Sequence, residues 1–135
     1  MVKIKIEFIV LGDLLDPVEF SSFLDISPTN YWYKGDCISN NKNIFRKETS
    51  WEYSTEFIQT YYLEEVSDLL LQKFGTYVSK ISKYVKSRKL ETKINVITES
   101  VFGETPSLFL NKNLIDFLSR IEGVLDIDLY VLDPK

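Results

Sequence analysis

The sequence predicts a single compact domain that combines β-strands with α-helices. Segments in which every second residue is apolar, typical of strands, alternate with segments in which apolar residues recur at intervals of three and four, typical of helices. The length of 135 residues and the hydrophobic share of 44% fit one globular unit. A strand–helix–strand order at both ends of the chain suggests a degenerate duplication.

The first strand and the first helix have clear boundaries. Residues 2–11 alternate between apolar and charged side chains, which predicts a strand with one buried face. Asp16 then supplies a helix N-cap, Pro17 fits the first helical position and Glu19 the third, so a helix is expected through residue 24. The predicted buried stripe of this helix is Phe20, Phe23 and Leu24.

The segment after this helix is rich in turn-forming residues. Ser27-Pro28-Thr29 ends the helix, and residues 30–47 hold Gly35, Asp36 and four asparagines around an aromatic triplet. This composition predicts a long loop or an irregular hairpin. Residues 50–57 follow as a strand in which Trp51 is expected to be structural.

The second half of the chain predicts two helical regions and further strands. Residues 63–85 carry a sustained helical pattern that Gly75 interrupts, and a break into two helices at this glycine is favoured over one long helix. Strands are expected at 92–99 and 107–110, a helix from Asn113 to Gly123, and a last strand at 124–132. The last strand is expected to bury Leu125, Ile127, Leu129 and Val131.

The absence of histidine limits the chemistry of this chain. Histidine is the usual general base and the commonest metal ligand, and the sequence contains none. The one cysteine, Cys37, has no histidine to activate it and cannot form an internal disulfide. We therefore expect no catalytic residue, no cofactor and no metal. The charged start and the absence of a long apolar run predict a cytoplasmic protein without a membrane segment.

Charge is distributed unevenly along the chain. Residues 73–93 hold seven of the 16 basic residues and one of the 20 acids, a formal charge of +6, whereas the remainder has a formal charge of −10. The net charge of −4 disfavours a nucleic-acid partner and favours a basic protein. The basic helix face that carries Lys80, Lys83 and Lys86 is expected to be a solvated surface.

Several short motifs, in this order, resemble a bacterial family known only as domain of unknown function 4279. They lie through most of the chain: Phe8, Gly12-Asp13, Leu15-Asp16-Pro17, Ser27-Pro28-Thr29, Lys34-Gly35-Asp36, Ser50-Trp51, and Leu114, Leu118 and Gly123 before the closing strand 125–130. The resemblance implies an α+β domain with an antiparallel-rich sheet and helices packed on one face. Small bacterial proteins of this kind are similar to immunity proteins, which neutralise toxin domains.

The preferred functional hypothesis is a non-enzymatic protein-binding module of this immunity type. Exposed tyrosine and tryptophan are typical of interface anchors, and acids steer a basic partner. The predicted partner-binding residues are Tyr31, Trp32, Tyr33, Asp13 and Glu19. The partner would be a protein, such as a basic toxin domain. Nothing in the sequence indicates the oligomeric state.

Two alternatives remain open. The first is a small metal-dependent or carboxylate-based enzyme in which Asp13 joins Asp126 and Asp128, whose spacing of two places both carboxylates on one face of a strand. The competing interpretation is that these two acids form the solvated face of an edge strand. The second alternative is a structural or regulatory subunit of a larger complex.

Overall fold

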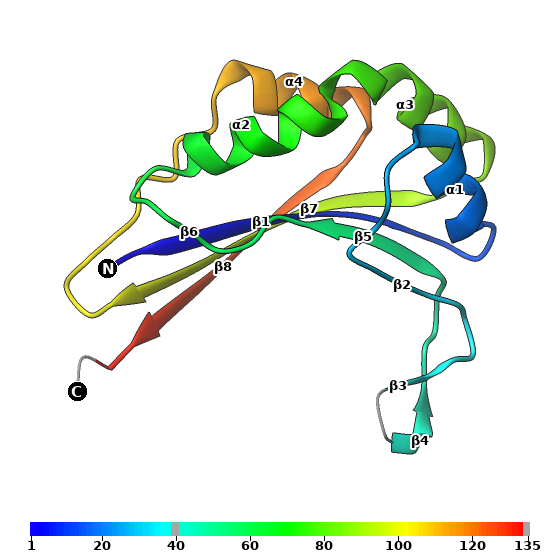
Figure 1. The fold of residues 1–135 in the computed structure, drawn as a ribbon, viewed down its shortest axis with the longest axis horizontal. Helices are drawn as coiled ribbons and strands as arrows, with labels where there is room; N and C mark the ends of the chain where they lie inside the picture. Colours follow the sequence, from blue (N-terminus) through cyan, green and yellow to red (C-terminus); the bar gives the residue numbers. More distant parts are fainter. Residues whose placement is uncertain (39–40, 134–135) are drawn as a thin grey trace.

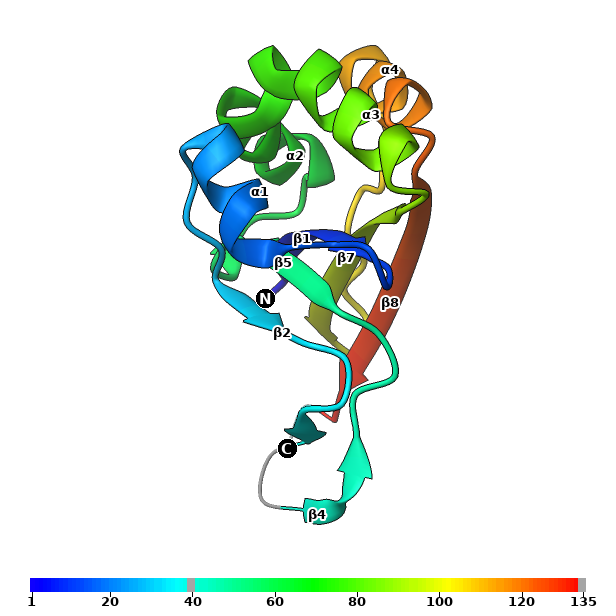
Figure 2. The ribbon, with the colours of Figure 1, turned by 90° about the vertical axis from the view of Figure 1, so that its right-hand side faces the viewer.

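The fold is a twisted sheet with all of its described helices on one face (Figures 1 and 2). A computed structural model describes residues 1–38 and 41–133, and the statements below concern these residues. The helices are α1 (Pro17–Leu24), α2 (Leu63–Phe74), α3 (Val78–Ser87) and α4 (Lys112–Arg120), with a 3₁₀ turn at Gly75–Tyr77. The combination of helices with an antiparallel-rich sheet confirms the expected α+β class.

The main sheet is built around the first strand. Its strands are β1 (Lys3–Leu11), β2 (Asn30–Trp32), β5 (Ser50–Ser54), β6 (Ile58–Gln59), β7 (Glu91–Val101) and β8 (Val124–Leu132). The strand order is β2-β5-β1-β7-β8, and β6 pairs with the start of β1. All neighbours are antiparallel except β7 and β8, which run parallel and are joined through α4. A separate pair, β3 (Cys37–Ile38) and β4 (Asn41–Phe45), projects from the body as a hairpin (Figure 2).

The hydrophobic core lies between the helices and the sheet. The even-numbered residues of β1 point into it and are fully buried, as the alternation predicted. Phe8 is at the centre: its ring contacts the edges of Trp51, Phe74 and Phe117 at centroid distances of 5.0 to 6.2 Å. Phe74 lies on α2 and Phe117 on α4, and Phe20 on α1 packs against Trp51. These contacts hold the three helices against the same part of the sheet.

The helix boundaries follow local sequence signals. The Asp16 carboxylate accepts a hydrogen bond from the Glu19 N–H at 3.1 Å, which is the predicted N-cap of α1. The helical pattern of residues 63–85 breaks at Gly75, as expected. Two details were wrong. Phe23 is exposed, and α4 begins at Lys112, one residue earlier than predicted, because the Asn111 side chain caps it by accepting a hydrogen bond from the Leu114 N–H.

Three sheet predictions also need correction. Residues 107–110 form no strand, and only Ser107 makes an isolated bridge to Tyr62. Leu129 and Val131 are exposed because β8 is the edge of the sheet and extends beyond the cover of the helices. The two ends of the chain, which suggested a duplication, pair their strands differently. β1 and β5 are antiparallel, whereas β7 and β8 are parallel.

The helices in the described part of the chain are too short or too polar to cross a membrane.

Candidate functional site

The two faces of the sheet differ completely in charge. The face under the helices carries no charged side chain on its described strands, whereas the opposite face, which we call the open face, has no helix over it (Figure 2). Cross-strand register places six acids and three lysines on the open face: Glu7, Glu52, Glu91, Glu99, Asp126, Asp128, Lys3, Lys5 and Lys93. The open face is therefore acidic.

Ion pairs neutralise only part of this charge. Lys93 lies 3.3 Å from the Asp126 carboxylate, and Lys5 lies 4.0 Å from Glu7, which also accepts a hydrogen bond from Asn95. Among the described residues Glu52 and Asp128 make no ion pair. Partial burial raises the pKa of Glu52, and the nearby Glu7 carboxylate raises it further against the smaller opposing effects of Arg46 and Lys5.

A hairpin arm borders the open face. The arm, described at residues 35–38 and 41–46, starts at a turn in which the Asp36 N–H donates to the Tyr33 carbonyl and Gly35 adopts a φ of +91°. A glycine is needed at this position because φ is positive there. The backbones of Gly35 and Arg46 are hydrogen-bonded at 2.9 Å, so the arm is closed at its base.

The arm contributes nothing to the described core but exposes apolar side chains. Ile44 is 48% and Phe45 52% exposed. Where the arm meets the sheet there is a groove of about 370 Å³, whose lining includes both of these residues together with Ile9, Trp32 and Glu52. An apolar surface thus lies directly beside an acidic one.

The aromatic triplet Tyr31-Trp32-Tyr33 lies on strand β2 and directly after it. Tyr31 and Trp32 point to opposite faces of the sheet. Trp32 shares the open face with Glu52 because it pairs with Ser50, and the Arg46 guanidinium lies 3.8 Å from its ring centre. Tyr31 points to the other side, where its ring meets the edge of Tyr33 at 6.1 Å. Both tyrosines are exposed, and Trp32 is half-buried.

The two acids predicted to bind a partner are each paired with a base. Asp13 lies 3.2 Å from the Lys34 ammonium, and Glu19 on α1 pairs with Arg88. Such exposed pairs contribute little to stability, but each base reduces the attraction that the acid exerts on a cation. The role of these two residues in binding stays a prediction.

The acids of the enzymatic alternative lie on different parts of the surface. Asp126 and Asp128 share the open face of β8, whereas Asp13 follows β1 and pairs with Lys34. No group of three potential ligand residues in residues 1–38 and 41–133 could hold a metal ion. Cys37 is exposed on β3. The expectation of a chain without metal or catalytic residues remains a prediction.

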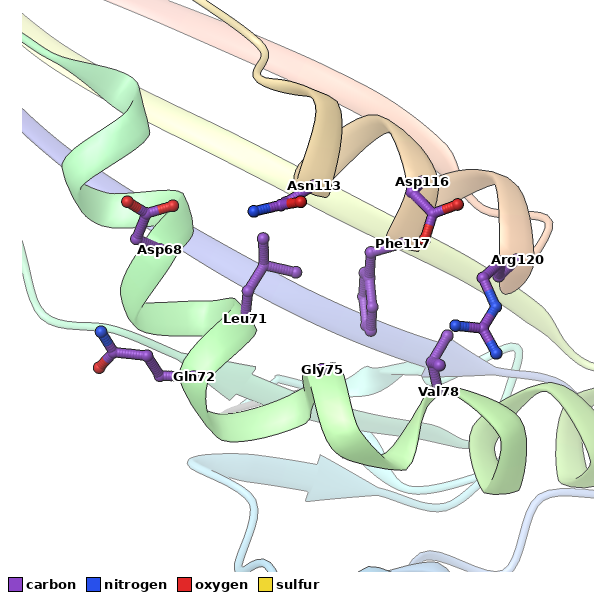
Figure 3. A pocket seen from close by; sticks show the side chains of 9 residues that line it. All are labelled: Asp68, Leu71, Gln72, Gly75, Val78, Asn113, Asp116, Phe117 and Arg120. Carbon is purple, nitrogen blue, oxygen red and sulfur yellow. The ribbon is translucent and has the colours of Figure 1, made fainter.

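A second groove, of about 430 Å³, lies between α2 and α4 (Figure 3). Its floor is apolar, and the polar rim is formed by Asp68 and Gln72 from one helix and by Asn113, Asp116 and Arg120 from the other. All five rim side chains are exposed, so water screens their charges. The rim of this groove is therefore open to solvent.

The sequence predicted a long loop or an irregular hairpin at residues 30–47, and the pairing of β3 with β4 agrees with the hairpin. It did not indicate the apolar surface of the arm or most of the open face. The acids at 7, 52 and 99 appear in the sequence only as the polar side of three separate strands. Their proximity depends on the pairing of β1 with β5 and β7, which are far away along the chain. Ile44 and Phe45 were the available signal for the arm, because two large apolar residues lie there in an otherwise polar segment.

Comparison with known proteins confirms the resemblance drawn from the sequence. The model of a family described as "Domain of unknown function (DUF4279)" matches residues 2–132. No curated protein and no solved structure matches the chain.

Proposed function

This chain belongs to the DUF4279 family, and we propose that it is a non-enzymatic protein-binding module of the immunity type. Its partner is a basic protein domain, such as a bacterial toxin, that docks on the open face and on the arm. The observation that carries this proposal is the arm, which exposes Ile44 and Phe45 beside an acidic sheet face. Exposed apolar side chains on a projecting element are typical of an interface.

The two parts of this surface have different roles in the proposed complex. Glu52 and Asp128 attract a basic partner over several ångströms because no lysine or arginine in the described part of the chain pairs with them. Phe45 and Trp32 would be desolvated on docking and would hold the partner in place. The acids therefore set the association rate, and the aromatic side chains set the dissociation rate.

The partner can be identified by comparing captured proteins. Immobilised protein is exposed to an extract of the source cells, and bound proteins are identified by mass spectrometry for the natural chain and for Phe45→Ala. Val18→Ala is the matched control, because Val18 is an equally exposed apolar residue on α1. The proposal expects a basic protein that is lost with Phe45→Ala and retained with Val18→Ala.

Kinetics with the identified partner then separate the two roles. Phe45→Ala is expected to raise the dissociation rate at least about tenfold, as for an interface anchor worth about 2 kcal/mol. Asp128→Asn is expected to lower the association rate and its dependence on salt. Co-production of the chain with the partner should also suppress the partner's toxicity. A partner that binds the Phe45→Ala variant normally, or one that is acidic, would contradict the proposal.

A further inference from the structure

Strand β8 leaves one edge of the sheet unpaired. It is the last strand in the order β2-β5-β1-β7-β8, and in both ribbon views nothing lies beyond it (Figures 1 and 2). Among the described residues no element pairs with its outer edge over Val124–Leu132. An unpaired edge presents a row of free N–H and C=O groups that can bind a further strand.

The second half of this edge is apolar on both faces. Leu129, Tyr130, Val131 and Leu132 are each 50% to 61% exposed. Proteins usually protect such an edge with lysine, proline or a bulge, and these four residues include neither lysine nor proline and pair regularly with β7. This segment combines free backbone groups with an exposed apolar surface.

The hydrogen bonds to β7 fix which peptide groups of β8 point outward. The Phe102 N–H donates to the Leu132 carbonyl at 3.2 Å, so the peptide groups of Leu132 face β7. Because the direction alternates along a strand, the N–H and C=O groups of Ile127, Leu129 and Val131 point away from the sheet. These are the groups available to a new neighbour.

We propose that β8 pairs with β8 of a second copy of this chain, antiparallel and across a two-fold axis at Leu129. Leu129 then faces its own copy as a hydrogen-bonded pair, and Ile127 faces Val131. The outward groups of all three residues are satisfied by the partner. On the open face Asp128 faces Tyr130 of the other copy rather than another acid.

The positions of the two acids select this register. An axis at Asp128 would place that carboxylate opposite itself, and an axis at Ile127 would place Asp126 opposite Asp128, both of which like-charge repulsion disfavours. An axis at Tyr130 also separates the acids but pairs five residues instead of seven. The axis at Leu129 therefore gives the longest apolar overlap without facing acids.

The dimer is independent of the partner surface proposed above. The arm projects from the opposite side of the sheet, next to β2 (Figure 1), so it stays accessible when two copies join through β8. The dimer would hold one continuous sheet with two arms.

Sedimentation equilibrium over about 1 to 500 μM protein tests the dimer. The natural chain should show reversible dimerisation, and Leu129→Lys should weaken it at least about tenfold, because two ammonium groups would then face each other and an apolar contact is lost from both copies. Val18→Lys, at an equally exposed apolar residue on α1, should dimerise normally. A chain that remains monomeric throughout, or a dimer that Leu129→Lys leaves intact, overturns the proposal.

Cross-linking tests the register without a destabilising change. In a Cys37→Ser background, Leu129→Cys should form a disulfide dimer on mild oxidation, since facing Cα atoms in such a pair are about 5.5 Å apart and disulfides tolerate this separation. Val131→Cys should not, because its copy would lie about four residues further along the strand, roughly 13 Å away. Equal cross-linking of both variants overturns the register at Leu129.

Discussion

At the scale of single residues, Trp51 shows how one side chain joins three elements. It lies on β5, its indole N–H donates to the Ser21 hydroxyl at 2.9 Å, and its ring meets the rings of Phe20 on α1 and Phe74 on α2 edge to face. Its side chain is completely buried. The sequence predicted a structural role for Trp51, and the structure confirms it.

The first prediction follows from this burial. Trp51→Ala should lower the free energy of unfolding by about 3 to 5 kcal/mol, because the substitution removes a large apolar contact, leaves a cavity and strips the Ser21 hydroxyl of its partner. Denaturant unfolding measures the loss. Trp32→Ala is the control: this half-buried tryptophan should cost no more than about 1 kcal/mol. Equal losses for the two variants would contradict the prediction.

The second prediction concerns Glu52, whose pKa is raised above 4.5 mainly by burial and then by Glu7. The folded chain therefore binds a proton on Glu52 more tightly than the unfolded chain does. The free energy of unfolding therefore decreases as the pH rises through the pKa of Glu52 in the unfolded chain and then through its higher pKa in the folded chain. At neutral pH the charged carboxylate of Glu52 destabilises the fold. Glu52→Gln should raise the denaturation midpoint at pH 7, and this gain should disappear as the pH falls below about 4.

A matched variant separates this effect from a general loss of negative charge. Asp13→Asn removes an exposed carboxylate that pairs with Lys34, so it should give no comparable gain at pH 7. If both substitutions stabilise the chain equally, reduced net charge is the cause and the environment of Glu52 is not.

At the scale of secondary-structure elements, local signals predicted more than pairing did. Asp16 and Pro17 determine the start of α1, and Gly75 determines the break between α2 and α3, because caps and breaks depend on a few neighbouring residues. The segment that contains β2 was expected as a long loop or an irregular hairpin and not as a strand of the main sheet, since the hydrogen bonds of β2 come from β5 about 20 residues later. The exposure of Leu129 was missed because a sequence does not show which strand is at an edge.

The third prediction tests the turn between α2 and α3. Gly75 has a helical φ of −58°, and a Cβ at this position would meet no atom within 4 Å. Gly75→Ala should therefore stabilise the chain by about 0.5 to 1 kcal/mol by restricting the unfolded state. Thermal unfolding measures the change.

Gly12→Ala provides the opposite case. Gly12 has a φ of +150°, and a Cβ there would lie 2.7 Å from a Leu90 methyl group. This substitution should destabilise the chain. A stabilising effect of Gly12→Ala, or a destabilising effect of Gly75→Ala, would contradict the prediction.

At the scale of the whole molecule, folding and recognition are assigned to different parts of the chain. The described core draws on the helices and on the covered face of the sheet, whereas the arm and the open face lie outside it. The family match and the α+β class could be predicted from the sequence. The sequence singled out Trp32, and it placed Asp126 and Asp128 on one face of a strand, but it did not bring these residues together. The rest of the surface is assembled from strands that meet through long-range pairing.

The fourth prediction follows from this separation. Replacing residues 36–45 by Asn-Gly, between the hydrogen-bonded Gly35 and Arg46, should change the free energy of unfolding by less than about 1 kcal/mol. The same deletion should abolish binding of the basic partner. Denaturant unfolding and partner binding measured on one preparation check both expectations, and a deleted chain that is largely unfolded would show that the arm supports the fold.

The central position of β1 also affects how the protein is made. β1 precedes β7 by many residues, and its nine-residue ladder with β7 cannot be completed until residue 99 has been added. At about 5 to 20 residues per second, the roughly 88 residues from the end of β1 to this point take roughly 4 to 18 s on the ribosome. During this time β1 has only the short strands β5 and β6 as sheet neighbours, and its edge toward β7 stays unpaired. The speed of translation thus sets how long the nascent chain is exposed to aggregation.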